Sequence, residues 1–429
     1  TFEAYAAPTQ HPLYVLLCAV LGGVFGEWGD RALVLVCLLS HGLLVIGTYR
    51  LGAAVFGRWS GALGALFVAA SASFLLYAAR GYVDAPFLAL VIWAAVREVE
   101  GRNPLLLLIA AGLLRPEAWV LSALWWLATI RPAASRRWAS SPGGLGHPSL
   151  GTSIAYGLAL AAAPVIWALT DLAVTGDPLH SLHATSELAD DLGRERGLDE
   201  VPGGFVSFIG NTVRPPVAIL APIGAALAVW RFGWHAIRVP LALFAAGLIT
   251  FVGTGVLGLS ILPRYLTVPA VAVCLFAGYA LLGFTEQRDR TRTLWARASA
   301  AAAVVGVIGL ILLAPSLTNV REEVRFIRAT HDSLIALLDD PAVRDAMRCG
   351  TLTFPTYRLV PDARWHLEGA RIGSRSALRR ERGVEVFALG QKALRRYGLA
   401  AGTSPRVNLP SPGYEPFARH GLLAAYRRC

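Results

Sequence analysis

Apolar runs of about 20 residues recur along the chain up to about residue 315, and short polar stretches separate them. A helix of that length spans the hydrocarbon core of a bilayer, which is roughly 30 Å thick. The pattern therefore predicts about ten transmembrane helices. Their expected positions are residues 29–54, 60–79, 85–99, 103–113, 117–130, 152–172, 213–231, 238–257, 265–284 and 297–315.

Some apolar runs are short for a membrane span. Residues 11–26 are interrupted by glycines and predict an interfacial or partly inserted helix. Residues 85–99, 103–113 and 117–130 are too short to cross alone, since a helix rises only ~1.5 Å per residue. Either flanking residues extend these helices, or one side of the membrane is hollowed there. A lipid-linked substrate would sit in such a hollow.

The composition agrees with this pattern. The 429 residues are 55% hydrophobic and 16% charged, with a mean hydropathy of +0.53, whereas soluble domains carry about 25% charge. Backbone polar groups in lipid must be satisfied within helices, so the expected class is an all-α polytopic protein of the plasma membrane. No cleavable signal peptide is visible, and the chain begins with Thr1 instead of Met, which predicts a fragment or a processed product.

The charges of the loops predict the orientation. One set of loops is rich in arginine, and the positive-inside rule places it in the cytoplasm. The other set is acidic: the loop 171–214 has eight acids against three arginines. Alternation then places the following outside: residues 1–28, Asp84, Arg115, the loop 171–214, Arg264 and the tail.

The tail differs from the rest of the chain, which suggests two domains, 1–315 and 316–429. Residues 319–347 have the apolar periodicity of an amphipathic helix. Thr351–Phe354 and Val384–Phe387 alternate as strands do, so a small extracytoplasmic α/β domain is expected. The tail has 18 arginines and one lysine against 11 acids. This basic charge favours either solubility or contact with anionic membrane lipids or phosphate ligands.

The five cysteines form two groups. Cys18, Cys37 and Cys274 lie in apolar runs and are typical small core residues. Cys349 and Cys429 lie in the tail, where an extracytoplasmic location would allow a disulfide to persist. We predict a bridge between these two; the alternative is that both are free thiols.

Asp84 is the only acid between Asp30 and Glu98. A carboxylate at the edge of hydrocarbon is costly unless it has a partner or a task. Two interpretations are open. Asp84 could cap a helix that has Pro86 in its first turn, or it could be an active-site acid at the membrane surface. One residue can serve both purposes.

Other candidates lie in the expected outer loops. Arg115 and Glu117 flank a tight turn, which is either functional or a local ion pair. Arg264 and Tyr265 are either functional or an interfacial anchor pair. Three further candidate loop contacts, which could ligate a metal if their segment were helical, are Asp177, His180 and His183.

The sequence does not assign a cofactor. No further strong set of ligands lies near Asp177, His180 and His183, so we assign no metal site. A divalent cation as cofactor is left as an open alternative. The chain has no Walker A, HExxH or GxSxG motif. Nothing indicates nucleic-acid binding.

The order of these features resembles the GT-C superfamily of integral membrane glycosyltransferases, which includes protein mannosyltransferases and actinobacterial arabinosyltransferases. The resemblance covers about residues 1–315. The segment His11–Tyr14 resembles the family's Pro-Pro-Leu surface helix, which is followed by a Phe-Gly pair. Arg31 opens the next span as in the family, and Asp84 matches the acid after its third span. Arg115 stands where many members have lysine, and Pro263–Leu266 resembles the family's Arg-Tyr motif.

One departure concerns the family's principal catalytic aspartate, which follows the first span. This chain has neither that span nor that aspartate, and Glu3 is the only upstream acid. We therefore expect an N-terminally incomplete member. The arginine- and alanine-rich composition suggests an actinobacterial one.

The resemblance implies transfer of a hexosyl or pentosyl group from a polyprenyl-phosphate donor to a cell-envelope acceptor. Asp84, with Glu3 as a stand-in, would be the catalytic acids. The implied contacts to the donor phosphate are Arg115, Arg264, Tyr265 and His11. Arginine suits a phosphate because it presents a bidentate fork.

Two other classes compete with an enzyme. A lipid or sugar transporter would show inverted repeats and charges near the midplane, whereas this chain shows no repeat and has its charges at one face. A non-catalytic scaffold of an envelope assembly is the third interpretation.

Overall fold

The computed structural model describes residues 9–130, 149–191, 194–288, 291–313, 317–367, 371–374, 382–398 and 408–429. Its contacts divide the chain into two compact units. The larger unit includes Thr9–Ser181 and Arg196–Ala314, and the smaller one includes Leu182–Glu195 and Pro315–Cys429.

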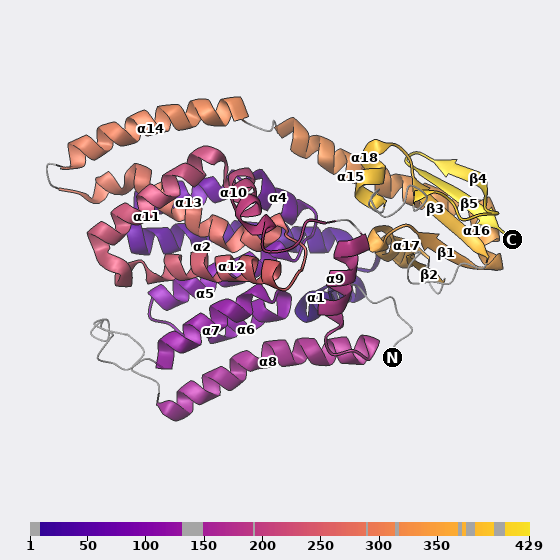
Figure 1. The fold of residues 1–429 in the computed structure, drawn as a ribbon, viewed down its shortest axis with the longest axis horizontal. Coiled ribbons are helices and arrows are strands. Elements are labelled where there is room, and N and C mark those ends of the chain that lie inside the picture. The colour runs from indigo at the N-terminus through magenta and orange to yellow at the C-terminus, as the bar shows by residue number, and fades with distance from the viewer. Residues whose placement is uncertain are drawn as a thin grey trace. The chain divides into compact units, whose positions relative to one another are not determined.

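Helices build the described part of the larger unit (Figure 1). They are α1 (Pro12–Phe25), α2 (Gly29–Phe56), α3 (Arg58–Ala69), α4 (Ala72–Ala79), α5 (Asp84–Val99), α6 (Leu105–Leu114), α7 (Glu117–Ile130), α8 (Leu150–Thr175), α9 (His180–Asp191, which continues into the smaller unit), α10 (Glu200–Val213), α11 (Pro215–Ala236), α12 (Arg238–Val256), α13 (Thr267–Leu282) and α14 (Thr291–Leu313). Every apolar run that predicted a span falls on one or two of these helices.

Several of these segments are long and apolar enough to cross a membrane. Within the described ranges there are five: Pro12–Phe56, Leu150–Thr175, Pro215–Ala236, Arg238–Val256 and Pro263–Glu286. A sixth results if α3 and α4, which meet at 56°, form one broken span. The chain is therefore a multi-pass membrane protein by fold, while the count of ten stays a prediction. Helices α5, α6 and α7 have only 16, 10 and 14 residues, as the short runs predicted.

Helix α13 lies at the centre of the larger unit. It packs against α2, α3, α11 and α12, and 94% of its apolar window is buried inside the protein. The interior around it is a single apolar cluster that includes Leu51, Phe56, Leu275 and Phe276. Protein side chains therefore surround this span, instead of lipid.

Glycines allow the neighbours of α13 to approach closely. A β-carbon placed on Gly278 would lie 2.6 Å from the carbonyl oxygen of Ser60 and 2.8 Å from the backbone nitrogen of Gly64. One placed on Gly224 of α11 would collide with the carbonyl of Phe276. Small residues at such crossings are typical of helix packing in membranes, where close backbone approach supplies the contact energy.

The smaller unit contains a five-stranded sheet (Figure 1). Its strands are β1 (Thr351–Phe354), β2 (Ile372–Ser374), β3 (Gly383–Ala388), β4 (Glu415–His420) and β5 (Leu423–Arg428), in the order β2-β1-β3-β5-β4. Strand β1 runs parallel to β2 and β3, and β5 runs antiparallel to β3 and β4. Its helices are α15 (Leu317–Asp339), α16 (Pro341–Ala346), α17 (Val360–His366) and α18 (Gln391–Tyr397).

The structure confirms the two strands expected in the tail and divides the expected helix in two. Both expected strands are present, as β1 and within β3. The expected helix 319–347 is two helices, because Asp340 caps a new one through the backbone nitrogen of Ala342 and Pro341 occupies its first turn. Side chains of α15 such as Leu334 and Leu337 share a core with Leu352 and Val384 of the sheet.

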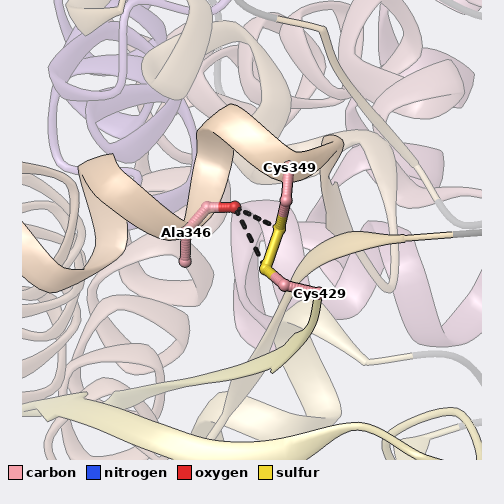
Figure 2. Close-up of a disulfide and its surroundings, with 3 residues drawn as sticks. All are labelled: Ala346, Cys349 and Cys429. Atoms are coloured by element: carbon pink, nitrogen blue, oxygen red, sulfur yellow. Dashed lines mark hydrogen bonds between the residues drawn. A yellow bond between two sulfur atoms is a disulfide. The ribbon is translucent and has the colours of Figure 1, made fainter.

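The predicted disulfide between Cys349 and Cys429 is present (Figure 2). It joins the turn after α16 to the residue after β5, across 80 positions of sequence. The sulfur of Cys349 lies 2.9 Å from the carbonyl oxygen of Ala346. The bridge ties the turn after α16 to the end of β5, which lies between β3 and β4 in the sheet.

Replacing Cys429 by serine should lower the free energy of unfolding of the smaller unit by about 4 kcal/mol, because a long loop is released in the unfolded chain. Proteolysis of the full chain in urea measures this loss. Cys274→Ser, which removes a thiol that is not bridged, is the control for a cysteine substitution. Equal resistance of wild type and Cys429→Ser would contradict the prediction.

Two neighbouring acids make the smaller unit sensitive to low pH. A hydrogen bond from His366, aided by Arg344, lowers the pKa of Asp339 below its usual 3.8. A hydrogen bond from His420, with Nε2 2.9 Å from Oδ2, does the same for the pKa of Asp340. The folded state then holds fewer protons than the unfolded state, so this stabilisation is complete above pH 3.8 and is lost as pH falls through the lowered values.

Replacing His420 by glutamine should therefore flatten the acid limb of the unit's stability profile. The measurement is the unfolding midpoint of full-length protein in urea between pH 5 and pH 2.5. His235→Gln, in the larger unit, is the control. An unchanged slope in His420→Gln would show that this pair contributes nothing to acid sensitivity.

Candidate functional site

Three charged side chains meet inside the larger unit. Asp84 is the first residue of α5, Glu117 is the first residue of α7, and Arg115 lies between α6 and α7 in an extended conformation. Nη1 of Arg115 donates to Oδ1 of Asp84, and Nη2 donates to Oε1 of Glu117. Asp84, Arg115 and Glu117 are 0%, 2% and 6% exposed.

This arrangement explains how three charges tolerate burial. The guanidinium fork satisfies two carboxylates at once, which a lysine ammonium cannot match in geometry. Phe87 and Tyr265 lie 5.5 and 5.7 Å from the guanidinium carbon, measured to their ring centroids. In the described part of the chain, Oδ2 of Asp84 and Oε2 of Glu117 have no hydrogen-bond partner. The cluster therefore has one cation, two anions and spare acceptor capacity.

The structure tests the structural interpretations of Asp84 and Arg115, whereas their functional roles stay predictions. The capping interpretation of Asp84 is wrong: Val83 is the N-cap of α5, and no side chain caps that helix. The local ion pair of Arg115 and Glu117 is confirmed. It extends to Asp84, which is 31 residues away in sequence.

His11 adjoins this cluster through the end of α6. Its Nδ1 lies 2.6 Å from the carbonyl oxygen of Leu114. A carbonyl only accepts, so Nδ1 carries the proton and Nε2 keeps its lone pair. Burial of the ring lowers its pKa from 6.5 to about 4, with Arg115 and Arg264 acting in the same direction. The ring is therefore neutral at pH 7, and Nε2 has no proton to donate to a phosphate.

Arg264 and Tyr265 lie in the 3-10 turn Pro263–Leu266, just before α13. Two guanidinium groups lie near the ring of Tyr265. The guanidinium carbon of Arg115 is 5.7 Å from the ring centroid, and that of Arg264 is 5.9 Å from it. Arg264 is half-buried, and its Nε has no hydrogen-bond partner among the described residues. Tyr265 thus links the buried arginine to a second, more accessible cation.

The loop candidates form a turn instead of a ligand set. Oδ1 of Asp177 accepts from the backbone nitrogen of Leu179 at 2.9 Å, and α9 begins only at His180. The helical spacing that would align Asp177 with His180 and His183 is therefore absent. Across the described ranges, no group of three or more His, Cys, Asp or Glu side chains could hold a metal ion. Glu3 lies outside the described residues.

A second buried acid, Asp171, lies near the end of α8; the sequence pattern places it in the acidic loop 171–214 and does not single it out. It is 1% exposed, and its carboxylate accepts from Ser181, from the backbone nitrogen at 2.8 Å and from Oγ at 2.9 Å. Its flanking residues Thr170 and Leu172 continue an apolar helix, and that isolation was the signal available in the sequence.

Comparison with known proteins concerns the fold. No protein-family model matches the chain, and no curated protein matches its sequence. The fold is similar to that of ArnT from Cupriavidus metallidurans bound to undecaprenyl phosphate, with a TM-score of 0.53 and 12% identity over 97% of this chain and 87% of that one. For ArnT in the apo state the TM-score is 0.49 and the identity is 14%, over 97% of this chain and 87% of that one.

A third structure is more distant. The Archaeoglobus fulgidus oligosaccharyltransferase, tethered with an acceptor peptide, gives a TM-score of 0.41 and 12% identity over 79% of this chain and 50% of that one. The likeness to ArnT shows that this chain has a fold similar to that of ArnT over 97% of its length.

Proposed function

We propose that this protein is a membrane glycosyltransferase that moves a hexosyl or pentosyl group from a polyprenyl-phosphate donor to an acceptor of the cell envelope. The observation that carries the proposal is the buried cluster of Asp84, Arg115 and Glu117 in a GT-C fold. The similar ArnT structure holds undecaprenyl phosphate. A buried cluster of this kind is costly for a membrane protein, and it marks a functional site by default.

The reaction needs two kinds of group. An acceptor hydroxyl forms a bond to the anomeric carbon while the bond from that carbon to the donor phosphate breaks. The hydroxyl proton passes to a base, and the polyprenyl phosphate leaves with the electron pair. Cations must stabilise the negative charge that grows on the leaving phosphate.

We assign these tasks by charge and by the hydrogen-bonding atoms that have no partner among the described residues. Asp84, whose Oδ2 has no hydrogen-bond partner within the described ranges, orients the acceptor. Arg264, half-buried with an unpartnered Nε among the described residues, contacts the phosphate. Arg115 is saturated by two acids and supports the site from within. The active face and the tail then lie outside the cytoplasm, as the loop charges predict.

The test is conversion of a radiolabelled polyprenyl-phosphate sugar by membranes that contain the protein. A glycosyltransferase releases polyprenyl phosphate and incorporates label into an acceptor. A transporter would move the label across the membrane with the donor bond intact, and a scaffold would do neither. Either of the last two results would overturn the proposal.

Replacing Arg264 by lysine should weaken donor use by about tenfold, because a point charge replaces the bidentate fork on the phosphate. The measurement is the KM for the donor, with kcat followed separately. Arg102→Lys, at a side chain that is 67% exposed, controls for the loss of an arginine. A donor KM equal to wild type in Arg264→Ala would remove Arg264 from the phosphate site.

A further inference from the structure

A second buried network joins α8 to the N-terminal end of α1. Ser181 lies at its centre and donates to Asp171 through Oγ, at 2.9 Å. The same oxygen accepts from Nε1 of Trp167 at 3.1 Å and from the backbone nitrogen of Gln10 at 3.4 Å. Asp171 and Trp167 are 1% and 3% exposed. The hydroxyl of Ser181 is thus hydrogen-bonded to the carboxylate of Asp171, the indole of Trp167 and the backbone of Gln10, the residue before His11.

The network continues to the charged cluster. The indole of Trp167 packs edge-on against the ring of His11, with centroids 5.4 Å apart, and against Trp119 at 5.8 Å. His11 in turn donates to the carbonyl of Leu114, whose next residue is Arg115. Every contact from Asp171 to Arg115 lies within the larger unit.

The backbone of His11 shows that this ring is held in place. Its φ of 46° and ψ of 69° are left-handed, a conformation that residues other than glycine seldom adopt. The strain costs of the order of 1 kcal/mol or more and persists only where surrounding contacts enforce it. The hydrogen bond to Leu114 and the contact with Trp167 are such contacts, and the charged groups that act on the ring are Arg115, Arg264 and Asp84.

We propose that Asp171 is a positioning residue which, through Ser181 and Trp167, fixes His11 in its Nδ1–H form so that Nε2 accepts a hydrogen bond from a substrate hydroxyl beside the Arg115 cluster. The hydroxyl belongs either to the sugar of the donor or to the acceptor. The proposal rests on the glycosyltransferase function for its substrate. The positioning of His11 can be measured without it.

Four substitutions distinguish an effect on the position of the His11 ring from an effect on the folding of the protein. Ser181→Ala removes the shared hydroxyl, and Asp171→Asn keeps the shape of the acid without its charge. Ser181→Thr keeps a hydroxyl and serves as the rescue. Thr170→Ala is the matched control, because Thr170 is also on α8 and, among the described residues, its hydroxyl bonds only to the carbonyl of Ile166, at 2.8 Å.

The direct readout is the protonation form of His11. Full-length protein with ¹⁵N-labelled histidine is examined in lipid by solid-state NMR, and His11→Gln identifies the resonance by its loss. Wild type, Ser181→Thr and Thr170→Ala should show the Nδ1–H form alone. Ser181→Ala and Asp171→Asn should show a mixture with the Nε2–H form. A pure Nδ1–H form in Ser181→Ala would overturn the positioning of His11 by this network.

The kinetic readout identifies the hydroxyl. Ser181→Ala should raise the KM for one substrate on the order of tenfold, since a misplaced partner weakens binding. A rise for the donor assigns the sugar hydroxyl, and a rise for the acceptor assigns the acceptor hydroxyl. A fall in kcat with both KM values unchanged would reveal lost active protein and overturn the substrate contact. Wild-type protein that transfers no sugar would refute the proposed function, while the NMR result would still decide the positioning.

Discussion

Replacing Asp84 by asparagine is expected to reduce sugar transfer by at least ~10²-fold while the protein still folds. The amide keeps the shape of the side chain but removes the charge that faces Arg115. Glu117 still pairs with Arg115 in this variant, so the buried cation is not left alone. The measurements are the initial rate with a labelled donor, and gel filtration together with thermal unfolding in detergent.

The matched control is Asp30→Asn. Asp30 also lies in the first turn of a helix, α2, but it is exposed, and in the described part of the chain its carboxylate accepts only from the neighbouring backbone nitrogen of Arg31. The Asp30→Asn variant should retain wild-type activity. Wild-type turnover in Asp84→Asn would reduce Asp84 to a structural partner of Arg115.

Replacing Arg115 by methionine should destabilise the larger unit by about 3–5 kcal/mol, because two buried carboxylates lose their shared cation. Methionine fills a comparable apolar volume, so lost packing is a small part of the effect. Resistance to unfolding in SDS, followed by tryptophan fluorescence, measures the loss. Arg102→Met, at an exposed position, is the control.

A triple substitution makes this prediction specific to charge. Adding Asp84→Asn and Glu117→Gln to Arg115→Met removes both uncompensated anions, and much of the lost stability should return. If Arg115→Met unfolds like wild type, or if the triple variant is no more stable than the single one, the three charges do not act as a unit.

The sequence predicted the helices well because hydropathy is a local property. The apolar run 29–54 lies within α2, whereas the run 60–79, expected as one span, forms two helices, α3 and α4, that meet at 56°. The strand β4 was missed because Pro416 and its charged neighbours hide the alternation, as is common at a sheet edge.

The candidate site was predicted in parts. Asp84 and Arg115 each stood out as charges next to apolar runs, yet their pairing across 31 residues depends on how α5 and α6 pack. The neutral form of His11 depends on one carbonyl oxygen, that of Leu114, which no spacing rule selects. Sequence patterns show which residues are unusual, whereas the partners of those residues come from tertiary structure.

The enclosed position of α13 separates two events in the biogenesis of the protein. Its segment, Pro263–Glu286, has a mean hydropathy of 2.0 and so can enter the bilayer through the translocon by itself. Its final place depends on close contact at Gly278, where a larger side chain would meet the backbone of α3. We therefore expect a bulky residue at Gly278 to leave insertion intact and to block assembly, so that the helices enter the bilayer without packing against one another.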